Sequence, residues 1–305
     1  MIADESDEYN LNCTPPSIVE AANSATLNLL PKKSKQKYET IYDKFIKWRE
    51  ENKVTSFSEN VLLAYFAILK MNYKPSTLWS HYSILNSIIS IKHNINIAKY
   101  CKLHSFLKQE SSGYIPKKAK TLTSEEINTF LKEAPDTDYL MIKVALGIGI
   151  MGACRREELY NLLINDVEVF DNTILVNIPT NKTNKPRAFT LIGTISNLCK
   201  KYINLRPNGM ENKKFFLKYT KGRCSKQVVG INTFGKMSKD IAIFLKLKDP
   251  QLYTGHTFRR SSATLLVDAG GDLLALKRHG GWKSNSTAEG YIDNSIQNKL
   301  DTANK

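Results

Sequence analysis

The sequence predicts a mainly α-helical protein with a small antiparallel β-sheet, arranged as an N-terminal helical domain and a C-terminal α+β domain. Apolar residues recur at spacings of three and four through most of the chain, as on one face of an α-helix. Runs typical of strands are short and gather in the middle of the second half. The stretch YIPKKAKT at 114–121 lacks periodicity and carries proline and lysine, which is typical of a linker.

The N-terminal domain is predicted at residues 34–108 as a compact bundle of helices. Its helices are expected at about 34–51, 59–69, from Pro75 onward, and 97–109. Ser58 is a suitable N-cap for the second helix, and Pro75 is suited to the first turn of the third. Residues 1–33 are mixed polar with three prolines, so we expect a flexible tail with at most one short helix.

The C-terminal domain is predicted at residues 122–305, after a linker at 109–121. Thr123 and Glu126 have the spacing of a capping box, so a helix is expected to begin there. Strands are expected at 167–169, 174–178 and 187–190, with a further short strand or strand-like loop at 214–219. The other helices are expected at about 138–151, 192–204, 231–245, 261–268, 272–279 and 295–302.

The composition indicates a globular protein with a polyanionic partner. The 305 residues leave room for two domains, and 42% hydrophobic residues are enough to bury real cores. The formal net charge is +15 at pH 7, which favours nucleic acid as the partner over a surface that is basic only for solubility.

The cysteines and the apolar runs exclude several other classes of protein. The five cysteines are scattered and show neither CxxC nor Cys/His spacing, so neither a disulfide framework nor a zinc site is expected. The N-terminus is acidic and polar, unlike a signal peptide, and no apolar run is long enough to span a membrane. We therefore expect an intracellular protein without a membrane partner, in the nucleus if the host is eukaryotic and otherwise in the cytoplasm.

The most informative stretch for chemistry is 253–291. It contains His256, Arg259 three residues later, Trp282, and Tyr291 nine residues after the tryptophan. A phosphodiester can be cleaved without metal by a nucleophilic hydroxyl, fixed cations around the phosphate, and a group that exchanges protons. This stretch supplies the hydroxyl, a cation, a titratable ring and an indole N–H donor, so it is a candidate catalytic segment.

These residues resemble the second catalytic box of the tyrosine recombinases, the phage-integrase family. That box is His-x-x-Arg, then His or Trp, then a tyrosine nine residues on, which here selects His256, Arg259, Trp282 and Tyr291 as the nucleophile. The resemblance implies a helical core-binding, SAM-like domain and a catalytic domain that together clamp double-stranded DNA. It also implies site-specific recombination or transposition through a 3′-phosphotyrosyl intermediate, with no metal, ATP or other cofactor.

The octamer GACRREEL at 152–159 resembles the family's first box, Gly-x-x-Arg-x-x-Glu-Leu. The match assigns Arg155 as the catalytic arginine and Glu158 as the carboxylate that steadies it, with the adjacent Arg156 as the competitor. The family carries a lysine in a β-hairpin turn near the leaving 5′ oxygen. Lys182 matches that position best, and Lys185 is the runner-up as the general acid.

Other basic residues are predicted to contact DNA or to lie outside the site. His279 competes with Trp282 for the fifth position, but only Trp282 has the nine-residue spacing to Tyr291. Arg278 is expected to be a surface or backbone-contacting charge. The predicted DNA-binding residues are Lys35, Lys37, Lys117, Lys118, Lys120 and Arg260.

Two alternatives stay open beside the active recombinase. One is a domesticated, transposon-derived DNA-binding protein that no longer recombines, and the other is a type IB topoisomerase, which shares the chemistry but acts as a monomer. For the recombinase we expect a dimer on one DNA site and a tetramer when two sites synapse. The phrase HTFRRSSATLLVDAGGD at 256–272 also resembles recombinases of eukaryotic crypton-type mobile elements.

Overall fold

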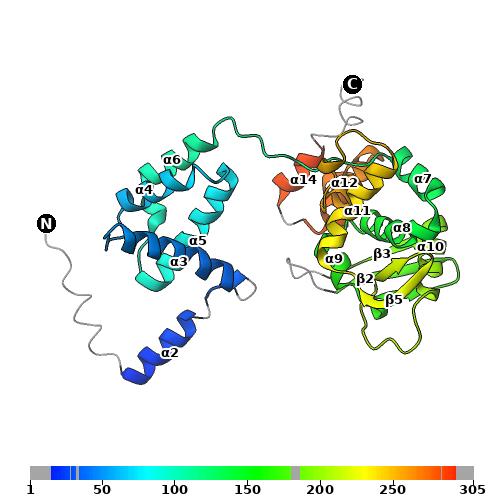
Figure 1. Ribbon diagram of the computed structural model, residues 1–305, viewed down its shortest axis with the longest axis horizontal. Helices are drawn as coiled ribbons and strands as arrows, with labels where there is room; N and C mark the ends of the chain where they lie inside the picture. Colours follow the sequence, from blue (N-terminus) through cyan, green and yellow to red (C-terminus); the bar gives the residue numbers. More distant parts are fainter. Residues whose placement is uncertain (1–14, 28, 32–33, 180–185, 283, 293–305) are drawn as a thin grey trace. The chain divides into compact units, whose positions relative to one another are not determined.

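The chain forms two compact units, which are described separately. The computed structural model describes residues 15–292, except 28, 32–33, 180–185 and 283. The units comprise Met1–Lys117 and Lys118–Lys305 (Figure 1). Their described parts are mainly helical with small antiparallel sheets, which confirms the predicted fold class.

The first unit is a bundle of α-helices around an apolar core. Phe45, Phe66, Leu85 and Leu103 are among its fully buried side chains, and they come from different helices. Pro75 occupies the first turn of its helix, and Asn94 ends that helix in the left-handed conformation at φ 52°. The helices are α3 (Lys35–Glu51), α4 (Glu59–Leu69), α5 (Pro75–His93) and α6 (Cys101–Ser111), with the short 3₁₀ helix η2 (Ile97–Lys99).

Two details of the first unit differ from the sequence-based boundaries. Helix α2 (Pro16–Leu27) lies within residues 1–33, the expected tail, for which at most one short helix was predicted. Helix α6 continues to Ser111, so helix covers the first three residues of the expected linker at 109–121. The Ser111 hydroxyl donates to the Leu107 carbonyl and accepts from the Trp79 indole, and this ties the last turn to α5.

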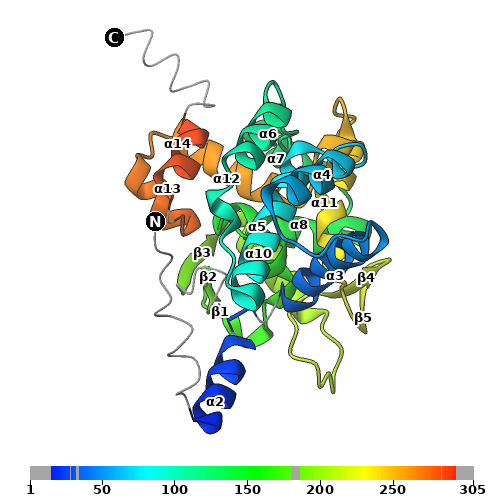
Figure 2. The same cartoon turned by 90° about the vertical axis from the view of Figure 1, so that its left-hand side faces the viewer.

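The second unit combines helices with two small antiparallel sheets (Figures 1 and 2). The first sheet has the order β1-β2-β3, and the second is the hairpin of β4 and β5. The strands are β1 (Val167–Val169), β2 (Thr173–Ile178), β3 (Arg187–Ile192), β4 (Leu217–Thr220) and β5 (Arg223–Val228). The helices are α7 (Ser124–Glu133), α8 (Asp136–Met151), α9 (Arg156–Asn161), α10 (Gly193–Asn204), α11 (Ile231–Phe244), α12 (Thr257–Asp268), α13 (Leu273–Gly280) and α14 (Asn285–Ile292), with 3₁₀ helices η3 (Ile164–Asp166) and η4 (Pro250–Leu252).

Helix α8 is the central element of this unit. Most of its side chains after the first turn are buried, and it contacts α10, α12, β3 and β4. Glycines allow two of these contacts to be close, because a Cβ at Gly147 or Gly149 would lie within 3 Å of a side chain of a neighbouring helix. Strand β2 alternates buried and half-buried residues, with Ile174, Val176 and Ile178 facing the core.

Four elements of the second unit depart from the sequence-based assignment. Strand β5 and the short helices α9 and α14 were not expected, because none of them carries a long apolar periodicity. Helix α12 begins at Thr257 and not near residue 261, since the Thr257 hydroxyl accepts from the Thr254 amide and donates to the Lys120 carbonyl. The earlier start puts His256 at the N-cap and Arg259 in the first turn. The helix expected near 295–302 lies outside the described residues.

Across the described part of the chain, no helix combines the length and the apolar character needed to cross a membrane.

Candidate active site

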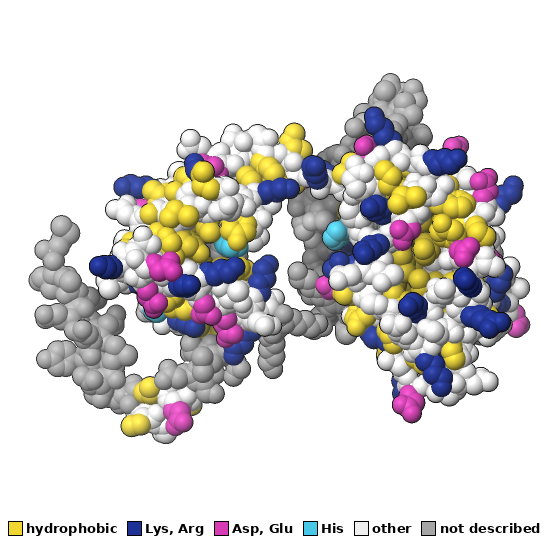
Figure 3. All heavy atoms as spheres, viewed as in Figure 1, with side chains coloured by type: hydrophobic (Ala, Val, Ile, Leu, Met, Phe, Trp, Pro, Cys, Tyr) yellow, Lys and Arg dark blue, Asp and Glu magenta, His cyan; other side chains and the backbone are white. Residues whose placement is uncertain are grey.

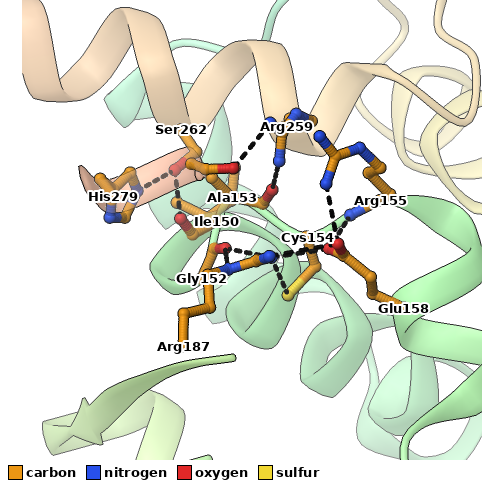
Figure 4. Close-up of polar contacts among 11 residues, drawn as sticks. Ile150, Gly152, Ala153, Cys154, Arg155, Glu158, Arg187, Arg259, Ser262 and His279 are labelled. Carbon is orange, nitrogen blue, oxygen red and sulfur yellow. Dashed lines mark hydrogen bonds and ion pairs between the residues drawn. The ribbon is translucent and has the colours of Figure 1, made fainter. Parts of the chain in front are cut away.

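The turn that follows α8 provides backbone carbonyls that hold several side chains of the candidate site. A Cβ at Gly152 would lie 2.1 Å from the Phe189 ring of β3, so the backbone here is too close to the sheet for any residue other than glycine. Ala153 is fully buried at φ 44°, a conformation that non-glycine residues rarely adopt. The carbonyls of Ile150, Gly152 and Ala153 accept hydrogen bonds from Ser262, Arg187 and Arg259 respectively (Figure 4).

Arg155 leaves this turn at the N-cap of α9 and is held by Glu158. Its amide donates to Glu158 Oε2 at 2.8 Å, and its Nη1 donates to Oε1 at 2.9 Å. The Arg155 side chain is 26% exposed, whereas that of Glu158 is 5% exposed. Glu158 therefore fixes one edge of the Arg155 guanidinium, while another part of the group still faces solvent.

A second arginine, Arg187 at the start of β3, binds the same carboxylate. Its Nη2 lies 2.6 Å from Glu158 Oε2, and its Nη1 lies 3.1 Å from Oε1. Burial alone would raise the pKa of Glu158, but the hydrogen bonds from Arg187 and the charges of both arginines bring it below its usual value. Glu158 is therefore ionised at neutral pH and binds both cations.

Arg259 is more deeply buried than Arg155, the other arginine of the two motifs. Its Nη1 donates to the Ala153 carbonyl at 2.6 Å, and its Nη2 donates to the Gly280 carbonyl at 2.8 Å. Burial, followed by the nearby Arg155 charge, lowers the pKa of Arg259 to about 10, so it remains a cation at neutral pH. The Arg155 charge acts on Arg259, so two guanidiniums lie in the same region, and such planar cations are suited to binding a phosphate.

Trp282 joins Arg259 to Tyr291. The Arg259 Cζ lies 4.1 Å from the centroid of the Trp282 ring, and the Trp282 and Tyr291 rings are 5.2 Å apart between centroids. A Cβ at Gly280 would lie 1.9 Å from the indole, and Gly281 ends α13 at φ 64°. The two consecutive glycines therefore let the chain reverse and bring the tryptophan back over the arginine.

Tyr291 lies on α14 at the edge of a small apolar cluster. Helix α14 packs beside α12 and α13 (Figures 1 and 2). The cluster consists of Ala153, Ala263, Val267, Leu276, Trp282 and Ala288, with Tyr291 half-buried against it. Arg260 also approaches the tyrosine, with its Cζ 5.7 Å from the centroid of the ring. This places Arg260 beside Tyr291, although the sequence suggested only a DNA contact.

His256 is subject to the charges of four arginines. Partial burial lowers its pKa below the ordinary value of 6.5, and the charges of Arg259, Arg156, Arg155 and Arg260 lower it further. The imidazole is therefore neutral at pH 7 and can accept a proton.

This shift predicts an acidic limb in the pH profile of strand cleavage. The rate of single-turnover cleavage should fall as the pH drops through the lowered pKa of His256, below 6.5, because the protonated ring cannot act as a base. His256→Gln should lower the plateau rate by about a hundredfold and remove that limb. A His256→Gln enzyme with an unchanged rate and the same acidic limb would contradict the assignment.

His279 is bound inside the structure and does not share the position of Trp282. Its Nε2 lies 2.7 Å from the Ser262 hydroxyl, which in turn donates to the Ile150 carbonyl. Burial lowers its pKa, and the charges of Arg187 and Arg259 lower it further. A neutral His279 thus ties α13 to α12 through Ser262 (Figure 4).

The structure brings five of the expected catalytic residues into one region of the second unit: Arg155, His256, Arg259, Trp282 and Tyr291, with Glu158 in support. Lys182 and its alternative Lys185 lie outside the described residues. Arg187 was missed by sequence reasoning, since a single arginine at the start of a short strand does not stand out. The available signal was its place in the sequence, two residues after Lys185.

The lysines expected to contact DNA fall into two groups. Lys37, Lys117 and Lys118 are exposed, as is Lys35, which lies 4.0 Å from Glu39. Lys120 is engaged within the second unit, because its Nζ lies 3.0 Å from Asp249 Oδ2 and 2.9 Å from the Lys248 carbonyl. Lysine and arginine side chains are spread over the face of each unit seen in Figure 3, with acidic groups between them.

Residues 120–298 match the family model described as the phage integrase family. The chain belongs to this family. Membership makes it a tyrosine recombinase, an enzyme that cleaves and rejoins DNA. No curated protein sequence matches the chain significantly.

Solved structures of similar fold support the architecture. The XerH site-specific recombinase, bound to a palindromic difH substrate after cleavage, is 20% identical with a TM-score of 0.61, covering 81% of this chain and 72% of that one. The Tn1549 transposon integrase, in complex with circular intermediate DNA, is 17% identical with a TM-score of 0.61, covering 90% and 95%. A lambda integrase dimer bound to a COC′ core site is 14% identical with a TM-score of 0.59, covering 92% and 96%. At these identities the likeness is one of fold.

Proposed function

We propose that this tyrosine recombinase performs site-specific recombination or transposition, with Tyr291 as the nucleophile and Arg155 and Arg259 as the phosphate-binding cations. The observation that carries the proposal is a set of contacts in one region: Arg155 is held by Glu158, and Arg259 lies against Trp282, which in turn contacts Tyr291. A tyrosine in the same region as two arginines suits attack by its hydroxyl on a phosphodiester whose charge those arginines stabilise.

The proposed reaction begins with attack of the Tyr291 hydroxyl oxygen on the scissile phosphorus, while neutral His256 accepts the phenolic proton. Arg155 and Arg259 stabilise the added negative charge on the non-bridging oxygens, and the Trp282 N–H donates to one of them. The bond to the 5′ oxygen breaks, and that oxygen takes a proton from the turn lysine, Lys182 or Lys185. The product is a 3′-phosphotyrosyl ester with a free 5′ hydroxyl.

Rejoining is the same sequence in reverse. A 5′ hydroxyl attacks the phosphotyrosyl phosphorus, the bond to Tyr291 breaks, and the phenol regains its proton. The ester keeps the energy of the broken phosphodiester, so neither ATP nor another cofactor is needed. Because every proposed group is a side chain, the reaction as proposed needs no metal.

The test is capture of the covalent intermediate on a nicked suicide substrate. The short 5′-hydroxyl fragment diffuses away after cleavage, so the enzyme cannot rejoin and should accumulate attached to a DNA 3′ end. A domesticated DNA-binding protein would bind the same duplex without forming an adduct. A type IB topoisomerase would form one but would also relax supercoiled DNA as a monomer, whereas the recombinase should require paired sites.

The proposed assembly is a dimer on one DNA site and a tetramer in synapsis. The support is the related fold of the lambda integrase, which was solved as a dimer on its core site. The side chains proposed to contact DNA are the exposed Lys35, Lys37, Lys117 and Lys118, together with Arg260. Membership of the crypton-type branch, and nuclear action in a eukaryotic host, remain proposals resting on the phrase at 256–272.

Chelation should leave strand cleavage intact. No group of three or more His, Cys, Asp or Glu side chains within the described ranges is arranged to hold a metal ion, and the proposed charge stabilisation comes from arginines. Adduct formation measured with and without EDTA should give the same rate within about twofold, set against the roughly hundredfold effect of losing a catalytic donor. Complete loss on chelation, restored by magnesium, would assign the chain another chemistry.

A further inference from the structure

Arg187 is a buried, hydrogen-bonded arginine of the site that has no role in the proposed reaction. Its side chain is only 10% exposed, and each nitrogen of its guanidinium is hydrogen-bonded. Nε and Nη2 donate to the Gly152 carbonyl at 3.2 and 2.9 Å, and the terminal nitrogens donate to both oxygens of Glu158. Arg187 is therefore largely engaged by its protein partners, and we expect its action to pass through them.

The charges of Arg155, Glu158 and Arg187 indicate how Arg187 could act through its partners. Arg155 and Glu158 alone form a pair with no net charge, and a paired guanidinium attracts a phosphate less than a free one does. Arg187 binds the same carboxylate (Figure 4), so the three groups together carry one positive charge. Arg187 is the more buried of the two arginines. The surplus charge is then left on Arg155, whose side chain is the more exposed of the two at 26%.

The same contacts also fix position. Arg187 holds the Gly152 carbonyl, three residues before Arg155. Strand β3 thus anchors the turn from which Arg155 extends. A planar fork suits this task, because it meets the carboxylate and the carbonyl simultaneously in fixed directions.

We propose that Arg187 is a positioning residue for phosphate activation: it binds Glu158 and the Gly152 carbonyl so that Arg155 is presented to the scissile phosphate with its charge uncompensated. The proposal rests on the proposed function, since it presumes that Arg155 contacts the phosphate. Arg187 itself does not touch the substrate.

A double-mutant cycle with Arg155 tests this. Arg187→Gln should lower the single-turnover rate of adduct formation by about tenfold to a hundredfold, as loss of an outer partner does for metal ligands. If Arg187 acts through Arg155, the Arg155→Ala/Arg187→Gln enzyme should cleave as slowly as Arg155→Ala alone, with no further loss. Rates are measured on the full chain at saturating suicide substrate, with the folded fraction checked by circular dichroism.

Neutralising the carboxylate gives a second readout. Once Arg187 is gone, Glu158 offsets Arg155, so Glu158→Gln added to Arg187→Gln should recover at least severalfold of the lost rate. Arg187→Lys keeps the charge but loses the fork, and its rate should lie between wild type and Arg187→Gln. If Arg187→Gln does not fold, the cycle is run with Arg187→Lys.

Arg206→Gln is the matched control. Arg206 also donates to backbone carbonyls, those of Lys214 and Asn212, but away from the site, so its loss should leave the rate per folded molecule unchanged. The proposal would be overturned if the rate losses of Arg155→Ala and Arg187→Gln multiply in the double variant. It would also be overturned if the Arg187→Gln enzyme cleaves as fast as wild type. A wild-type chain that forms no adduct would instead overturn the proposed function.

Discussion

Tyr291→Phe should abolish covalent attachment to DNA while leaving the fold and DNA affinity unchanged. The substitution removes one oxygen atom and keeps the ring that packs against Trp282 and the small cluster around it. Tyr291 is the proposed nucleophile, so the loss should be complete. The measurement is adduct formation on a nicked suicide substrate, resolved by denaturing electrophoresis, beside a binding titration on the same duplex.

Tyr160→Phe is a suitable control for this experiment. Tyr160 is a half-buried tyrosine of the same unit, and Lys214 lies over its ring at 4.3 Å from the centroid. The adduct yield of the Tyr160→Phe enzyme should equal that of wild type. A Tyr291→Phe enzyme that still becomes attached to a DNA 3′ end would show that another residue is the nucleophile.

Arg259→Ala should lower the cleavage rate by a factor on the order of 10² or more, as loss of a preorganised donor to a developing anion does. The effect should be large because Arg259 is 4% exposed and lies in a site where charge is poorly screened by water. The same substitution frees the carbonyls of Ala153 and Gly280 and removes the cation from the Trp282 ring. A fall in thermal stability should therefore accompany the loss of rate.

Two comparisons separate chemistry from stability in that experiment. Arg259→Lys keeps a cation but not the fork, so it should retain more rate than alanine while remaining well below wild type. Arg278→Ala removes an exposed arginine of α13 and should change the cleavage rate little. If Arg259→Ala cleaves at nearly the wild-type rate when folded, Arg260 becomes the next candidate.

Much of the fold was predictable because its signals are local. The helices of the first unit carry long apolar stripes, and the capping box at Thr123 and Glu126 is present with both of its hydrogen bonds. Strand β5 was missed because its residues are mostly exposed and polar, and its pairing with β4 depends on a turn at Lys221 and Gly222 with positive φ angles. Helix α14 was missed because eight residues with little periodicity depend on packing against α12 and α13.

The sequence by itself pointed to the family and to the candidate residues Arg155, His256, Arg259, Trp282 and Tyr291, because the resemblance rests on two motifs and a motif is a property of the chain. Only the tertiary structure decided which groups share a partner. It joined Arg187 to Glu158, separated by 29 residues, and Arg259 to the Ala153 carbonyl, separated by 106 residues. Such pairings depend on the path of the backbone between distant elements, and on the glycines and the strained turn that let those elements approach.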